Sequence, residues 1–383
     1  MRLYVHIPFC RSKCSYCAFF SQKLIPESKE IFFTGLKREI VARGAEAKGA
    51  LIRSIYFGGG TPSVLPLSDL QAIIELITAN FDLDRDIEFS MEGNPESMRD
   101  RDYIRGLMHL GINRVSIGLQ SLRPEMLEML GRLHTARQGL DTVLMLQDCG
   151  LDNVGVDLIW GLPGQKTAGW MEDLKSVVRY QPRHISCYCL TLEPGTPLAR
   201  RVGAGQFELP AEEEQARMYI YGAEYLESSG MLQYEVSNFA RMGYACSHNQ
   251  AYWQGEEFVG LGPSSVSTLG GYRRQNPSNI KDYARMPLSL SSDSGQIEFI
   301  SRGKALREKI MLSLRTARGL CLKEYRELCG RDFCASNQEL IEALHKHNLV
   351  RIRGGYLRLT KNGMLVSDAI ISRIIDSTQP RNQ

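Results

Sequence analysis

Three cysteines stand close together near the start of the chain, in the spacing Cys10-x3-Cys14-x2-Cys17. Three thiolates on so short a loop can surround one soft metal centre. A structural zinc site would need a fourth ligand at similarly tight spacing, and the neighbouring sequence offers no second pair of Cys or His residues. Three thiolates suit a 4Fe–4S cluster in which one iron stays open for a small chelating ligand. The spacing therefore predicts a cluster held by these three cysteines.

A glycine-rich loop is the second feature that could bind a small ligand. The strand-like run 54–57 leads into Gly58-Gly59-Gly60-Thr61-Pro62. Consecutive glycines let a ligand approach the backbone closely and leave peptide N–H groups free. The loop lacks the Gly-Lys-Ser/Thr ending of a phosphate-binding loop. By itself it indicates either a ligand contact or a simple turn.

The elements that must position these loops alternate regularly over the first 195 residues. β-rich runs predict strands at 3–7, 54–57, 87–92, 114–120, 154–159 and 184–190. Helical patterns lie between them at 27–48, 67–80, 99–110, 123–131, 136–149 and 167–180. Alternation of this kind is typical of βαβ units and a parallel sheet. Six such units favour an α/β fold with a partial (β/α)6 barrel of the TIM type.

Barrels of this type carry their sites at the carboxyl ends of the strands. Glu92, Gln120 and Asp157 each stand at or near the end of a predicted strand. One such residue could be a solvated strand terminus. Several of them, together with the cysteine loop and the glycine loop, indicate one shared rim.

The last third of the chain has a different pattern. A Glu-rich helix is expected at 211–230, and the serine-rich segment 286–295 resembles a linker. Helices at 298–316, 322–347 and 361–375 flank a hairpin at 349–359 that turns on Gly354-Gly355. We therefore predict a barrel at 1–200, a mixed α/β extension at 201–290 and a small winged-helix-like domain at 296–383. Three arginines in and beside the hairpin would fit DNA binding, but a packing module is favoured because fold does not give function: Arg351, Arg353 and Arg358.

Composition excludes several classes of protein. The chain has 383 residues, which fits two to three domains, and 46 Lys and Arg against 43 Asp and Glu give a net charge of +3. A net charge this close to zero is not typical of a protein whose main function is to bind nucleic acid. We find no apolar run long enough for a transmembrane segment, and the first residues lack the apolar core of a signal peptide. The ten cysteines are therefore not expected to form disulfides, and a cytoplasmic protein is expected, with peripheral membrane contact left open.

The motifs together resemble a known family. The segment from His6 to Cys17 looks like the signature of radical S-adenosylmethionine (SAM) proteins. In detail the chain is similar to the branch that contains oxygen-independent coproporphyrinogen III dehydrogenase (oxidase) and the HemW-type heme chaperones. The resemblance covers about residues 2–375 and includes the stretches 58–62, 92–95, 116–121, 157–164 and 193–198.

The resemblance implies a radical-SAM barrel and its cofactors. Cys10, Cys14 and Cys17 would hold a 4Fe–4S cluster, SAM would chelate the open iron, and one electron would cleave SAM to a 5′-deoxyadenosyl radical. The matching positions would place Tyr4 beside SAM and Gly59, Gly60 and Thr61 on its methionyl part. Four further residues match positions that contact SAM in the dehydrogenase: Glu92, Gln120, Arg132 and Asp157. For Arg132 the alternative is a charge exposed at the end of a helix.

Two local features distinguish the heme chaperones of this branch from the dehydrogenase. The dehydrogenase pattern has a fourth cysteine two residues after the third, where this chain has Phe19. Its absence is typical of the heme chaperones. The segment His248-Asn249-x-x-Tyr252-Trp253 matches the His-Asn-x-x-Tyr-Trp signature that is implicated in heme binding. A buried histidine among aromatic residues is the alternative.

A further segment is nearer the dehydrogenase. Many chaperones have Gly-x-Gly-x-Gly-Ala-His, whereas this chain has Gly260-Leu-Gly262-Pro-Ser without a histidine. A second histidine ligand is therefore in doubt, and Cys246 is an alternative thiolate ligand by proximity alone.

The function implied by the resemblance is a heme chaperone that passes heme to an unidentified apo-hemoprotein, with an unidentified electron donor. The alternative is an enzyme that oxidatively decarboxylates coproporphyrinogen III to protoporphyrinogen IX. A radical-SAM enzyme acting on RNA is a third class, which the near-neutral charge disfavours.

Overall fold

The computed structural model describes residues 1–98, 100–288 and 296–378. At the centre of this described part lies a parallel sheet of six strands that follow one another in chain order. They are β1 (Arg2–Ile7), β4 (Ile52–Gly59), β5 (Leu83–Gly93), β6 (Arg114–Gln120), β7 (Asn153–Trp160) and β8 (His184–Cys189). The predicted strands and the α/β fold class are confirmed. In the described chain β1 and β8 do not pair with each other, so the barrel is partial.

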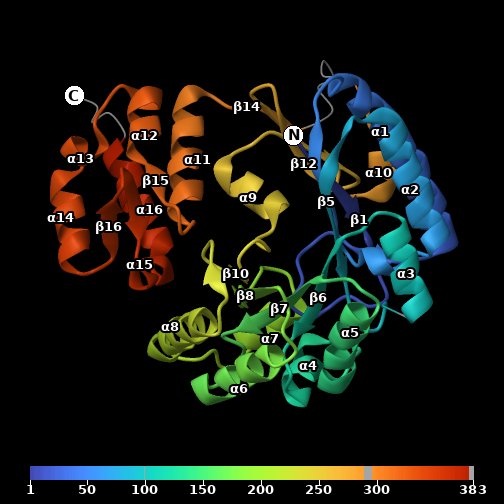
Figure 1. Cartoon of the computed structure of the whole chain (residues 1–383), viewed down its shortest axis with the longest axis horizontal. Helices are drawn as coiled ribbons and strands as arrows, with labels where there is room; N and C mark the ends of the chain where they lie inside the picture. Colours follow the sequence, from blue (N-terminus) through green and yellow to red (C-terminus); the bar gives the residue numbers. More distant parts are fainter. Residues whose placement is uncertain (99, 289–295, 379–383) are drawn as a thin grey trace.

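Helices cover the outer face of these strands (Figure 1). They are α1 (Pro26–Glu46), α2 (Leu67–Asn80), α3 (Arg101–His109), α4 (Pro124–Leu130), α5 (Ala136–Asp148) and α6 (Thr167–Val178). Short pieces complete this half: β2 (Phe9–Cys10), β3 (Gln22–Lys23) and the 3-10 helix η1 (Pro62–Val64). Position 99 of the predicted helix 99–110 lies outside the described residues.

Local sequence explains where these helices begin. The Asp100 carboxylate accepts a hydrogen bond from the Tyr103 N–H and starts α3. Thr135 and Gln138 form a reciprocal capping box at the start of α5. Apolar residues three or four positions apart then lie on the buried face of each helix. Ile104 and Leu107 are such a pair in α3.

The extension lengthens the sheet at both edges. At one edge β11 (Phe258–Leu261) pairs in parallel with β1, and β12 (Val266–Leu269), β13 (Tyr272–Gln275) and β14 (Gln296–Phe299) follow in antiparallel order. At the other edge β10 (Asn238–Ala240) and β9 (Leu232–Gln233) continue from β8. The sheet thus reaches 12 strands among the described residues. The predicted helix at 298–316 is wrong at its start, because β14 runs to Phe299 and the Ser301 side chain caps the next helix.

Four helices belong to the extension. They are α7 (Pro197–Gly203), α8 (Glu212–Ser228), α9 (Ser247–Gln254) and α10 (Ile280–Arg285). Helix α9 lies between the barrel strands and the C-terminal helices (Figure 1). It is therefore placed to contact both parts of the molecule.

The C-terminal part combines helices with a three-stranded antiparallel sheet in the order β15-β17-β16. Its elements are α11 (Arg302–Leu314), β15 (Leu320–Cys321), α12 (Leu322–Cys329), α13 (Phe333–Ser336), α14 (Gln338–Lys346), β16 (Val350–Arg353), β17 (Tyr356–Leu359), α15 (Lys361–Leu365) and α16 (Ser367–Thr378). The predicted hairpin is confirmed, but the predicted helix 322–347 is divided. Gly330 ends α12 in the left-handed conformation, and Asp332 caps α13. The predicted helix 361–375 is likewise divided, at Val366.

Most of the predicted linker 286–295 and the last residues of the predicted C-terminal domain, 379–383, lie outside the described residues. The predicted domain boundaries stay predictions. Within the described chain, no helix is both long and apolar enough to cross a membrane.

Candidate cofactor site and interior cavity

The cysteine loop follows β1 and is fixed at its middle by Ser15. The Ser15 N–H donates to the Leu130 carbonyl at 3.0 Å, and its hydroxyl donates to the Met129 carbonyl at 2.7 Å. The Leu198 N–H in turn donates to the Ser15 carbonyl at 2.8 Å. The ends of α4 and the start of α7 therefore hold the loop against the carboxyl end of the barrel.

The three predicted cluster ligands are half-buried, free thiols. The Thr61 hydroxyl lies 3.5 Å from the Cys10 sulfur, and Arg132 Nη1 lies 3.4 Å from the Cys14 sulfur. Burial raises the pKa of both Cys10 and Cys17, so their thiolates need a cation to compensate for lost solvation. In the described chain no three His, Cys, Asp or Glu side chains converge closely enough to hold a single metal ion.

The glycine loop supports the cysteine loop through its backbone. The Gly60 N–H donates to the Ile7 carbonyl at 2.8 Å, and the Thr61 N–H donates to the Phe9 carbonyl at 2.7 Å. These N–H groups, expected to be free for a ligand, therefore bind the chain itself. A Cβ atom at Gly60 would lie 2.6 Å from the Phe9 carbonyl oxygen, so only glycine permits this approach. Contact of this loop with SAM stays a prediction.

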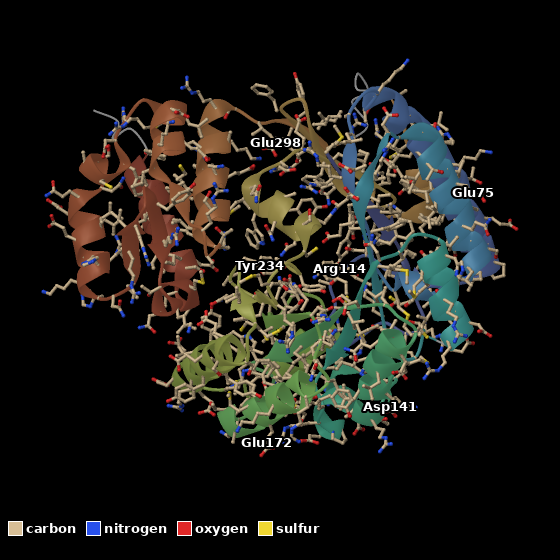
Figure 2. The ribbon with its side chains drawn as sticks, in the orientation of Figure 1. Glu75, Arg114, Asp141, Glu172, Tyr234 and Glu298 are labelled. Carbon is tan, nitrogen blue, oxygen red and sulfur yellow. The ribbon has the colours of Figure 1, made fainter. Side chains whose placement is uncertain are left out.

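A cavity of about 230 Å³ occupies the interior of the barrel. Four predicted site residues line it, from four separate elements: Tyr4, Glu92, Asp157 and His248. Figure 2 shows Arg114 and Tyr234, which also line this cavity, near the centre of the molecule, whereas Glu75, Asp141 and Glu172 lie on outer helices. The structure thus brings residues together that are far apart in the sequence.

The two carboxyl groups in the cavity are poorly solvated. Burial, together with the nearby Asp157 carboxylate, raises the pKa of Glu92 to about 7. Burial also raises the pKa of Asp157, although the Ser186 and Ser116 hydroxyls donate to it. A ligand that carries positive charge or hydroxyl donors would stabilise their ionised forms. SAM has both, in its sulfonium group and its ribose.

Several buried polar atoms in or near this cavity lack partners among the described residues, and they include His184 Nδ1 and Asn238 Oδ1. The Ser90 hydroxyl lines the cavity and forms no hydrogen bond in the described structure, and neither does Arg132 Nε. Arg132 Nη2 donates to Asn94 and to the Gly118 carbonyl, both at 2.6 Å. Arg132 is therefore half-buried at the rim and not an exposed charge at the end of a helix, and its contact with SAM stays a prediction. Unpaired buried donors and acceptors fit a site for a polar ligand such as SAM.

Gln120, the last residue of β6, has a left-handed backbone with φ of 69°. A register shift in the pairing of β6 with β7 occurs next to it, between Gly118 and Gln120. Its amide nitrogen lies close to Gly118, as Arg132 Nη2 and Asn94 Oδ1 do. A strained residue at the end of a barrel strand is typical of a functional position.

His248 is deeply buried, and both ring nitrogens have partners. Nδ1 lies 2.8 Å from the Ser54 hydroxyl, and Nε2 lies 2.9 Å from the Tyr252 hydroxyl. The side chain is 2% exposed, and burial lowers its pKa to about 3. An axial heme ligand needs a free nitrogen lone pair beside a space for the porphyrin. In the described structure both ring nitrogens face protein hydroxyls, and heme ligation by His248 stays a prediction.

Cys246 offers no better ligand. It is 4% exposed, lies 3.5 Å from Glu88 Oε1, and accepts a hydrogen bond from the Asn249 N–H at the start of α9. Its thiol thus forms hydrogen bonds within the protein.

Sequence reasoning missed several residues of the cavity wall. They include Tyr56, Ser90, Arg114, Ser116, His184, Ser186 and Tyr188. Most of them alternate along predicted strands with a period of two, which places them on one face. The alternation is visible in the sequence for His184, Ser186 and Tyr188, but it does not show which face of the strand borders a cavity.

Comparisons with known proteins agree with this geometry. The model of the Radical SAM superfamily matches residues 4–177, and that of the HemN C-terminal domain matches residues 300–366. A heme chaperone HemW of Synechocystis is 34% identical over 83% of this chain and 78% of that protein. A heme chaperone HemW of Lactococcus lactis is 30% identical over 97% of this chain and 96% of that protein.

The chain belongs to the HemW family of radical SAM proteins. A protein of Danio rerio, named radical S-adenosyl methionine domain-containing protein 1, mitochondrial, is 36% identical over 81% of this chain and 69% of that protein. Membership of the superfamily implies SAM and a 4Fe–4S cluster as cofactors.

The fold of this HemW family member also matches a solved structure over its whole length. Coproporphyrinogen III oxidase (HemN) from Escherichia coli superposes with a TM-score of 0.83, covering 99% of this chain and 90% of that chain at 22% identity. At this identity the likeness shows the fold. It confirms a shared architecture of barrel and C-terminal domain.

Proposed function

We propose that this protein is a heme chaperone of the HemW type in the cytoplasm. It holds a 4Fe–4S cluster coordinated by SAM, binds heme and delivers it to apo-hemoproteins. The observation that carries the proposal is the similarity to a heme chaperone along 97% of the chain, which includes the cysteine loop, the barrel and the C-terminal part. Phe19 supports the same branch, because it stands where the dehydrogenase has its fourth cysteine.

The chain's own residues have distinct roles in this proposal. Cys10, Cys14 and Cys17 hold the cluster, which with SAM would supply one-electron chemistry. Arg132 lies against the Cys14 sulfur and compensates negative charge at the rim. Glu92 and Asp157 face the cavity and accept hydrogen bonds from a bound ligand.

Heme retention and transfer test this function directly. The purified protein is mixed with hemin, separated from free hemin by gel filtration, and then incubated with an apo-hemoprotein from the same cells. We expect heme to stay with the protein and then to appear in the acceptor. A protein that elutes without heme would contradict the proposal.

The enzymatic alternative has its own experiment. The reconstituted protein is incubated without oxygen with SAM, a reductant and coproporphyrinogen III. We expect no protoporphyrinogen IX above background. Formation of protoporphyrinogen IX would show that the protein decarboxylates coproporphyrinogen III, and it would contradict a function limited to heme transfer.

A further inference from the structure

The cysteine loop presents positive charge to solvent. Arg11 and Lys13 stand between the cysteines, Lys23 follows them, and all three side chains are exposed. None of the three forms an ion pair in the described chain. The stretch 1–26 contains no Asp or Glu. Unpaired cations thus surround the thiols that are predicted to hold the cluster.

Helix α7 adds two arginines beside this loop. The Leu198 N–H of α7 donates to the Ser15 carbonyl, and Leu198 packs in an apolar cluster with residues of α4, which lies next to α7 in Figure 1. Arg200 and Arg201 are exposed on α7. Arg200 donates to a backbone carbonyl at 2.6 Å, and the Arg201 guanidinium lies 4.3 Å from the centre of an aromatic ring. Among the described residues no carboxylate pairs with either arginine.

The neighbouring elements also carry carboxylates. Glu125 and Glu128 of α4 are exposed, and so is Glu193, which precedes α7. None of the three belongs to the cysteine loop, so the loop itself presents charge of one sign.

Two large apolar side chains are exposed among these cations. Phe19 is 70% exposed, and its N–H donates to the Cys17 sulfur. Leu133 is 56% exposed and follows Arg132, whose Nη1 lies 3.4 Å from the Cys14 sulfur. An exposed aromatic ring among arginines and lysines is typical of an interface anchor. We call these residues together the basic face: Arg11, Lys13, Phe19, Lys23, Leu133, Arg200 and Arg201.

The basic face covers the place where an electron must enter. The three thiols beneath it are half-buried, so a redox group docked on this face comes close to the predicted cluster. Burial raises the pKa of Cys17, and the nearby charge of Lys13 partly offsets this rise. The charge of the loop therefore acts on the ligand sulfur atoms as well as on an approaching partner.

We propose that the basic face docks a small acidic protein that carries flavin mononucleotide (FMN) at its surface; this rests on the cluster of the proposed function. The cations pair with carboxylates of the partner, and the Phe19 ring packs on the apolar edge of the flavin. A flavin fits better than an iron–sulfur carrier, because it offers a flat ring to Phe19. The reduced flavin gives up one electron, the cluster takes it, and no covalent bond forms or breaks.

Reduction of the reconstituted full-length protein by a purified acidic flavodoxin with bound FMN tests the docking. At low salt, Lys13→Glu/Arg200→Glu should lower the second-order rate constant of cluster reduction by about tenfold, because opposite charges steer association. The difference should shrink at high salt, which screens exposed charges. An excess of dithionite should reduce the cluster of wild type and variant to the same extent, which shows that the variant holds an intact cluster.

The matched control is Lys48→Glu/Arg179→Glu. It makes the same change of net charge at two exposed positions, after α1 and at the end of α6, which lie at the amino end of the barrel strands. This control should be reduced by flavodoxin as fast as the wild type.

Binding is measured separately, by calorimetric titration with oxidised flavodoxin. Lys13→Glu/Arg200→Glu should raise the Kd by about tenfold, and Phe19→Ala by about fivefold, since an exposed aromatic anchor is expected at the interface. Leu144→Ala, an exposed apolar position on α5, should bind like the wild type.

The outcomes separate this proposal from heme transfer. Equal rates and equal Kd values for wild type and the Lys13/Arg200 variant would overturn it, as would a wild-type rate that does not depend on salt. Binding of an acidic ferredoxin but not of flavodoxin would refute a flavin partner. If no cluster forms, the cluster assignment and this proposal fail together. If the protein retains no heme while the basic-face variants lose flavodoxin binding, this proposal stands and heme transfer fails.

Discussion

At the scale of single residues, the guanidinium of Arg132 connects the cysteine loop to the barrel rim. It contacts the Cys14 sulfur, the Asn94 side chain and the Gly118 carbonyl, which come from three separate segments. A planar group with five donors can make such contacts at once, which a lysine cannot. The position of one thiol thus depends on tertiary contacts as well as on cysteine spacing.

The cluster ligands lead to the first prediction. Cys14→Ala should remove iron–sulfur absorbance and bound iron and sulfide after anaerobic reconstitution, because two thiolates cannot replace three. Cys189→Ala, an exposed cysteine at the end of β8, is the control and should keep the cluster. A full complement of iron in the Cys14 variant would refute the ligand assignment.

The burial of His248 leads to the second prediction. Its ring packs against Ser54, Tyr56 and Tyr252, with the charges of Arg2 and Glu88 nearby. Since burial lowers its pKa to about 3 from 6.5, the unfolded chain binds more protons between these values. The free energy of unfolding should therefore fall as the pH falls below 6.5, by up to about 1.4 kcal/mol per pH unit from this group.

Urea unfolding at pH 7, 6 and 5 checks this dependence. His248→Gln should lose part of it, so the difference in unfolding free energy between wild type and variant should shrink as the pH falls. The exposed His109 serves as control, and His109→Gln should follow the wild type. Parallel curves for wild type and His248→Gln would show that His248 does not titrate in this range.

At the scale of elements, α9 is held at the barrel by its N-terminus. Glu88 of β5 accepts hydrogen bonds from the N–H groups of Ser247 and His248, both at 2.9 Å. Arg2 of β1 donates to the Ser247 hydroxyl, also at 2.9 Å. A carboxylate from a neighbouring strand thus supplies the negative charge that a helix N-terminus prefers. This contact fixes which face of α9 points into the barrel.

The third prediction concerns this attachment. Glu88→Ala should lower the free energy of unfolding by about 1–3 kcal/mol, because it leaves buried N–H groups without acceptors. Amide hydrogen exchange should increase in α9 before it increases in α2. Glu75→Ala, an exposed position on α2, should change neither. Unchanged protection of α9 in the Glu88 variant would contradict the anchoring role.

At the scale of the whole molecule, backbone contacts join the barrel edge to the C-terminal part. The Val236 N–H donates to the Arg315 carbonyl at 2.8 Å, and the Ala317 N–H donates to the Tyr234 carbonyl at 3.0 Å. Glu235, between them, forms a bridge with Thr316 and is 1% exposed. Its carboxylate accepts from the Ser237 N–H and from the Asn238 side chain. A titratable group is thus buried at the junction.

The fourth prediction follows from this burial, which raises the pKa of Glu235 from 4.5 to about 7. Between these values the folded protein binds more protons, so this group's contribution to stability falls as the pH rises through 7. The loss reaches at most about 3 kcal/mol. Amide protection factors in residues 302–321, which compare each exchange rate with that of the unfolded chain at the same pH, should be lower at pH 8 than at pH 6.

The matched variant is Glu235→Gln, which cannot ionise. Its protection factors in the same segment should depend much less on pH than those of the wild type. Glu212→Gln, an exposed position at the start of α8, is the control and should behave like the wild type. Equal pH dependence in the wild type and Glu235→Gln would assign the effect to another group.

The fold was predictable where the pattern is local. Strands such as Arg114–Gln120 and helices such as Ala136–Asp148 follow from runs of apolar residues and their caps. The extension was not predictable in the same way. The strands of the extension are two to four residues long, and β11 pairs with β1 across more than 250 positions of sequence. Short strands without a neighbouring partner carry little local signal.

By itself, the sequence determined the cysteine loop, the order of strands and helices and the family, because each depends on residue types at short, regular spacing. Only the tertiary structure decided the surroundings of His248 and the two faces of α9. Ser54, whose hydroxyl contacts His248, is 194 positions away in the sequence, and no local pattern predicts such a contact. A histidine in a motif is the same residue whether it is a ligand or a buried hydrogen-bonding group. Packing between distant segments decides which of the two it becomes.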